Sequence, residues 1–223
     1  MEHHFETELD VLKQKLLTMA SHAETAVNQA LRALTQRDLE LALRVKDDDR
    51  ILDQFEVEID DLAIRLLTKA PLAGNLRLVT TAMNISQNLE RVGDEATKIA
   101  KRARDLSQEP PVKINIDLPR MAMLALNMLK AALDAFVNHD PAAARAIIPR
   151  DKEVDALNKQ IHETLARHMV ESPDTIGRCL NWMVASKSLE RIADHAKNVA
   201  EEVVYLCEAQ DIRHAAGRKP DAA

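Results

Sequence analysis

The chain has 223 residues, of which 46% are hydrophobic and 30% are charged, a composition typical of a folded globular protein. Its formal net charge of −6 provides no positive field, so we expect no sequence-independent binding to nucleic acid. Only four glycines and five aromatic residues occur, which disfavours a β-sandwich or barrel and favours long helices packed through aliphatic side chains.

Apolar side chains at helical spacing predict three long helices in the first half of the chain, over residues 7–37, 38–69 and 75–106. Asp38 is suited to cap the second helix, because its carboxylate accepts hydrogen bonds from backbone N–H groups that the helix leaves free. Pro110 and Pro111 have no N–H to donate and end this pattern. Residues 107–116 are therefore predicted to be a linker.

Three further helices are predicted after the linker, each opened by an acidic or hydroxyl residue with a proline one or two residues later. They begin at Asp117, at Asp140 and at Ser172, and the last runs to about Asp211. The tail from residue 212 to residue 223 is expected to fray.

The chain shows no feature of a secreted or membrane-spanning protein, so we expect it in the cytoplasm. No apolar run approaches the roughly 20 residues that a membrane helix requires, and the N-terminus has neither a basic segment nor an apolar one. Cys179 and Cys207 fall on one predicted helix, roughly 42 Å apart at 1.5 Å per residue. They cannot form a disulfide with each other, and we expect two reduced cysteines.

The two halves of the chain repeat one another. Residues 83–100 match residues 183–200 and share the block Leu-Glu-Arg-x-x-Asp, and residues 30–53 match residues 132–155. Three successive helices therefore match three successive helices in order, which indicates an internal duplication. We predict an all-α protein of two tandem homologous three-helix bundles, over residues 7–106 and 117–211.

The repeated helices carry acidic pairs four residues apart, which places both carboxylates of a pair on one helix face. Carboxylates gathered from two adjacent helices repel one another unless a cation neutralises them, and hard oxygen ligands suit Mg²⁺, Mn²⁺, Ca²⁺ or iron. The sequence predicts one such metal site in each half. The candidate ligands are Asp49, Asp53, Glu90 and Asp94 in the first half and Asp151, Asp155, Glu190 and Asp194 in the second.

The alternative is that these pairs are ordinary solvated helix faces. With 36 acidic residues, roughly six such pairs arise by chance, so the duplication, and not the spacing, favours metal. Arg91 and Arg191 argue against metal, because each is placed to pair with a nearby carboxylate and so to reduce its affinity for a metal ion. His195 is either an exposed helix histidine or an additional ligand. No phosphate-binding loop or catalytic motif occurs, and we expect a protein that is not an enzyme.

Several segments resemble the PhoU family of phosphate-transport regulators. The resemblance rests on residues 89–94 and 188–201, on Asn75-Leu76-Arg77-Leu78-Val79, and on Gln210-Asp211-Ile212-Arg213-His214. Ala193 departs from the glycine usual at that place, and Glu95 stands where the second half has His195.

The resemblance implies a cytoplasmic bacterial regulator, a homodimer, that restrains the phosphate-starvation response. Its partners are expected to be the phosphate ABC transporter and the sensor histidine kinase of the phosphate two-component system. It also implies metal, namely magnesium, manganese, zinc or iron, at the eight carboxylates named above. Two alternatives stay open: a carboxylate-bundle protein with hydrolase or metal-storage activity, and a purely structural bundle.

Overall fold

The computed structural model describes residues 2–69 and 72–213, and helices are the only regular secondary structure in that part of the chain. The all-α fold predicted from composition and periodicity is confirmed. In chain order the helices are α1 (Glu2–Gln36), α2 (Leu39–Leu67), α3 (Ala73–Ser107), α4 (Leu118–Asn138), α5 (Pro141–Ile147), the 3₁₀ turn η1 (Ile148–Arg150), α6 (Asp151–Glu171), η2 (Pro173–Thr175) and α7 (Ile176–Glu208).

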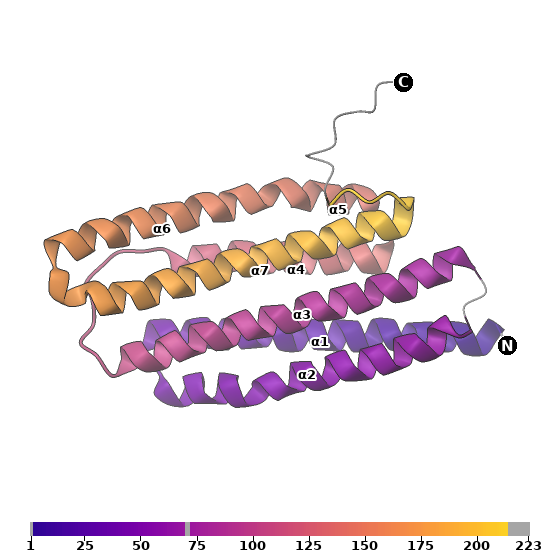
Figure 1. The fold of residues 1–223 in the computed structure, drawn as a ribbon, viewed down its shortest axis with the longest axis horizontal. Helices are drawn as coiled ribbons and strands as arrows, with labels where there is room; N and C mark the ends of the chain where they lie inside the picture. The colour runs from indigo at the N-terminus through magenta and orange to yellow at the C-terminus, as the bar shows by residue number, and fades with distance from the viewer. Residues whose placement is uncertain (1, 70–71, 214–223) are drawn as a thin grey trace, which may run out of the picture.

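The helices form two three-helix units that lie side by side (Figure 1). α1, α2 and α3 pack against one another in the first unit, and α4, α5, α6 and α7 do so in the second. α3 and α7 pack along each other where the units meet, and α1 contacts α4 there. The third helix of each repeat thus forms the centre of the molecule.

Three aspartates cap helices as the sequence predicts. Asp38, Asp117 and Asp140 each accept a hydrogen bond from the backbone N–H three residues further on, at 2.9, 3.1 and 2.9 Å respectively. Each bond satisfies one of the four N–H groups that a helix leaves without an internal acceptor. These caps fix where α2, α4 and α5 begin.

The second helix of the second repeat is interrupted, whereas the sequence pattern predicted a single helix from Asp140. α5 ends at Ile147, and η1 joins it to α6. Pro149 lies within η1, where its missing N–H and its ring disrupt regular α-helical hydrogen bonding. The same effect at Pro173 places the short turn η2 before α7.

α4 corrects the expectation that no segment is apolar enough to span a membrane. It has 21 residues with a mean hydropathy of 1.2, and by length and composition alone it is long and apolar enough to cross a membrane. Most of its apolar side chains pack in the core, although Met123 and Val137 are exposed, and it contacts α1 and α7. A helix that is apolar on most sides is also what the interior of a helical bundle requires.

The linker between the repeats is extended and held in place by two arginines. Arg178 donates to the Pro110 carbonyl at 3.1 Å, and its side chain is only 11% exposed. Arg37 donates to the Ser107 carbonyl at 3.2 Å. Alternate linker residues pack against the core, namely Val112, Ile114 and Ile116. Both cysteines are free thiols.

Candidate functional site

The four predicted ligands of the first half lie near one another where α2 packs against α3, and this set of carboxylates is called the first groove. Burial raises the pKa of Glu90 to about 7, and the charges of Asp94, Asp53 and Asp49 add to that rise. Burial likewise raises the pKa of Asp49, followed by the effect of Asp53 and Asp94. These mutual effects show that side chains from positions about 40 residues apart in sequence lie within electrostatic reach of one another.

Glu56 belongs to the same groove and was missed at the level of sequence. Burial raises its pKa, and Asp60, Asp53 and Asp94 raise it further, while the charge of Arg91 lowers it. Positions 49, 53, 56 and 60 follow helical spacing along one face of α2. That spacing was visible in the sequence, but the repeat provided no match for it because position 158 is Asn.

Gly93 lets α2 and α3 approach each other closely beside this groove. A methyl group at that position would collide with Leu52 Cδ1 and would lie 3.4 Å from Asp49 Oδ1. The absence of a side chain at Gly93 therefore leaves room for the Asp49 carboxylate against the backbone of α3.

The four predicted ligands of the second half lie near one another where α6 packs against α7, and this set of carboxylates is called the second groove. Burial raises the pKa of Asp194 to about 6, and the charges of Asp151 and Glu190 contribute next. The pKa of Asp155 is raised in the same way, by burial and then by the charges of Asp151 and Glu190. The structure thus brings both predicted sets of carboxylates together.

Two lysines enter the second groove. Lys197 Nζ lies 3.2 Å from Asp151 Oδ2, and Lys187 Nζ lies 2.5 Å from Glu190 Oε2. Asp151 is only 6% exposed, and its other oxygen, Oδ1, has no hydrogen-bond partner. The lysines therefore neutralise this groove only in part.

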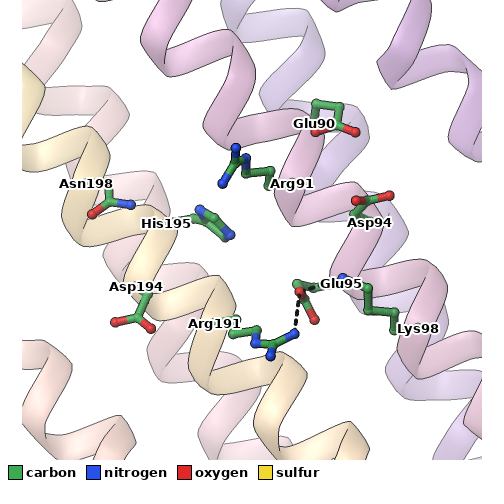
Figure 2. Close-up of a pocket in the computed structure, with 9 residues that line it drawn as sticks. All are labelled: Glu90, Arg91, Asp94, Glu95, Lys98, Arg191, Asp194, His195 and Asn198. Atoms are coloured by element: carbon green, nitrogen blue, oxygen red, sulfur yellow. Dashed lines mark hydrogen bonds and ion pairs between the residues drawn. The ribbon is translucent and has the colours of Figure 1, made fainter.

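A polar cleft of about 690 Å³ separates the two grooves, between α3 and α7 (Figure 2). Glu90 and Asp94 of α3 and Asp194 of α7 also line this cleft, and their carboxylate groups are directed away from the opposite helix. Glu95, which is 4% exposed, forms two ion pairs within the cleft. Its Oε1 lies 2.8 Å from Lys98 Nζ and 3.4 Å from Arg191 Nη1.

The cleft explains the positions of two residues that sequence alone left open. Arg191 pairs with Glu95 of the other repeat and not with a carboxylate of its own groove. His195 is partly buried in the cleft, where its Nδ1 lies 3.0 Å from Asn88 Oδ1, so the exposed-histidine interpretation was wrong. Burial lowers the pKa of His195, and Arg91 lowers it further.

The donor atoms of both grooves suit a hard cation. All are carboxylate oxygens, the free Asp151 Oδ1 points to a missing partner, and Gly93 leaves space beside Asp49. In residues 2–69 and 72–213, no three Asp, Glu, His or Cys side chains are grouped so as to hold a metal ion as they stand. Binding would therefore require rotation of exposed side chains such as Asp53 and Asp94.

The sequence model of the PhoU domain matches this chain twice, at residues 16–103 and at residues 118–203. The chain belongs to the PhoU family. It is 38% identical over 212 residues to a "phosphate-specific transport system accessory protein PhoU homolog" of Pseudomonas putida, covering 94% of this chain and 83% of the relative. The Escherichia coli K12 PhoU accessory protein is 32% identical, with 97% and 90% covered.

Solved PhoU structures share the whole architecture. The crystal structure of PhoU from Pseudomonas aeruginosa superposes with a TM-score of 0.88 at 37% identity, covering 92% of this chain and all of that one. The phosphate transport system regulatory protein PhoU from Streptococcus pneumoniae gives a TM-score of 0.86 at 28% identity, covering 93% of this chain and 99% of that one.

Proposed function

We propose that this chain is a negative regulator of the phosphate-starvation response. In this proposal it couples the phosphate ABC transporter to the sensor histidine kinase of the phosphate two-component system through protein–protein contacts. It acts in the cytoplasm as a homodimer, without catalysing a reaction. The observation that carries the proposal is the twofold PhoU match together with the names of the relatives, which are accessory and regulatory proteins of phosphate transport.

Deletion of the gene in its own bacterium tests this role. A phosphate-starvation reporter that is silent in high phosphate should become active in the deletion strain, because the kinase is no longer restrained. A plasmid copy of the gene should silence it again. A reporter that stays silent after deletion would contradict the proposal.

A second candidate role is cation binding at the two carboxylate grooves, with hydrolysis or metal storage as its possible purpose. The observation that favours cation binding is the gathering of four or more carboxylates in each groove, with Glu90 and Asp194 raised in pKa by burial and by their acidic neighbours. A bound cation would relieve that repulsion. Elemental analysis of the purified protein and a phosphatase assay separate these roles from regulation, because the regulatory role predicts no turnover.

A further inference from the structure

The two grooves differ at the positions that carry positive charge. In the alignment of residues 83–100 with 183–200, Lys187 and Lys197 correspond to Gln87 and Thr97. Both lysines form ion pairs inside the second groove, with Glu190 and with Asp151. The first groove has a neutral side chain at each of the two matching positions.

The grooves also differ at the positions that carry negative charge. Glu56 extends the acidic face of α2, whereas the matching residue of α6 is Asn158. The amide oxygen of Asn158 accepts a hydrogen bond from Ser186 Oγ at 2.6 Å, so a contact within the protein occupies it. Asp60 is likewise matched by His162, whose Nε2 lies 3.3 Å from the Met183 carbonyl oxygen.

These substitutions give the grooves very different formal charges. Within the described residues the first groove has six carboxylates that form no ion pair, and with the positive charge of Arg91 they amount to −5 when ionised: Asp49, Asp53, Glu56, Asp60, Glu90 and Asp94. The second groove has four carboxylates and two lysines, which amount to −2. Attraction of a divalent cation scales with this charge and is reduced by any ammonium group that already lies beside the carboxylates.

We propose that the duplicated sites are unequal: the first groove binds a divalent cation tightly, and in the second groove Lys187 and Lys197 take the place of that cation. This inference rests on the proposed cation-binding role. Asp151 Oδ1 leaves the second groove some affinity, since this buried carboxylate oxygen has no hydrogen-bond partner and forms no ion pair within the described part of the chain. A cation that enters it must displace the ammonium groups.

Titration of the metal-free full-length protein with Mn²⁺ tests the inequality. Wild-type protein should show one tight class of binding. Asp49→Asn with Asp94→Asn should abolish that class, whereas Asp151→Asn with Asp194→Asn should leave it unchanged. In the Asp49→Asn with Asp94→Asn variant only the second groove can bind Mn²⁺. Adding Lys187→Gln and Lys197→Gln to that variant should strengthen its Mn²⁺ binding by at least about tenfold.

A reciprocal exchange tests the same idea without removing an ion pair from Asp151. Gln87→Lys with Thr97→Lys places the lysines of the second groove into the first and should weaken its Mn²⁺ binding by at least about tenfold. Gln36→Lys with Asn127→Lys is the matched control for net charge, because it adds the same two charges at exposed positions of α1 and α4. Circular dichroism checks that each variant is folded.

The outcomes distinguish the inference from the role on which it rests. Equal Mn²⁺ affinities in the two grooves, or lysine variants that bind as the wild type does, would overturn the inequality and leave cation binding intact. Absence of Mn²⁺ binding in every variant would overturn both. Silencing of the starvation reporter is a separate measurement and does not depend on either result.

Discussion

At the scale of single residues, the most perturbed carboxylate is also one that the repeated motif identifies. Glu90 is partly buried and faces Asp94, Glu56 and other carboxylates of the first groove, and its pKa rises from 4.5 to about 7. Its neutral form is therefore favoured in the folded protein over a pH range in which an unfolded chain would be ionised.

This raised pKa predicts that the metal-free protein loses stability as pH rises. Between pH 4.5 and 7 the folded state retains a proton on Glu90 that the unfolded state has released, so the free energy of unfolding falls through that range. Because solvent screens this partly buried group, we expect a loss of about 1 kcal/mol by pH 8. Glu90→Gln should remove that part of the slope.

Urea denaturation in EDTA at pH 5 and pH 8 measures the effect. Asp194, whose pKa rises from 3.8 to about 6, contributes a slope of the same sign at lower pH and should remain in the variant. Glu163→Gln, at an exposed position of α6, is the control. An identical pH slope in wild type and Glu90→Gln would contradict this explanation.

At the scale of helices, the two repeats fill the same place between their second and third helices with side chains of different size. In the first repeat a larger side chain of α2, Leu52, packs over Gly93 of α3. In the second repeat the matching residues are Val154 and Ala193, and both are buried. The second repeat has one carbon fewer on its second helix and one more on its third, so the total side-chain volume at this contact is nearly the same in both repeats.

This exchange predicts that Gly93→Ala and Leu52→Val compensate each other. Gly93→Ala alone forces a methyl group against Leu52, and such overpacking costs about 1–3 kcal/mol, offset in part by the better helix propensity of alanine. Leu52→Val alone leaves a small cavity and costs about 1 kcal/mol. In the Gly93→Ala background, however, Leu52→Val should increase stability.

Chemical denaturation of the four proteins in this double-mutant cycle gives the coupling energy, which we expect to be at least about 1 kcal/mol. The same pair of substitutions at distant sites would be additive. Additive effects of Gly93→Ala and Leu52→Val would show that the collision is relieved by another movement.

At the scale of the whole molecule, the packing of α3 against α7 joins the two repeats through one continuous core. Arg102 of α3 donates to Asn181 of α7 at 3.0 Å, and Asn84 of α3 donates to the buried Glu202 of α7 at 3.0 Å. The buried faces of both helices continue into the common core. Separation of the repeats would expose this apolar surface and leave Glu202 without its partner from α3.

We therefore predict that damage to the first repeat lowers the stability of the second. Leu16 of α1 is completely buried, so Leu16→Ala should cost about 2–5 kcal/mol and lower Tm by roughly 5–15 °C. Trp182, the only tryptophan, lies on α7 in the second repeat, so its fluorescence follows the unfolding of that helix. Its fluorescence transition should shift together with circular dichroism at 222 nm.

Leu165→Ala, at a completely buried position of α6, is the matched control in the second repeat and should shift both signals by a similar amount. A Trp182 transition that stays at the wild-type temperature in Leu16→Ala, with a biphasic circular dichroism curve, would show that the repeats unfold independently.

The all-α fold, the duplication and the two sets of carboxylates were determined by the sequence itself, because helical periodicity and the i, i+4 relation are local properties of the chain. The position of Glu56 on the acidic face of α2 also follows from helical spacing, but it was missed because the second repeat has no acidic residue at the matching position. The break at Pro149 was missed because apolar spacing continues through it, although the proline disrupts the helical hydrogen bonds.

Only the tertiary structure decided which charges meet. The packing of α3 against α7 directs Arg191 to Glu95 and places His195 beside Asn88, contacts between positions about 100 residues apart that no local pattern encodes. The packing of α7 against α6 likewise brings Lys197 to Asp151, whereas Lys187 and Glu190 are three residues apart on α7 and meet within that helix. Electrostatic interactions depend on distance in space and on burial, so the difference between two repeats with the same acidic motif becomes visible only once they are folded.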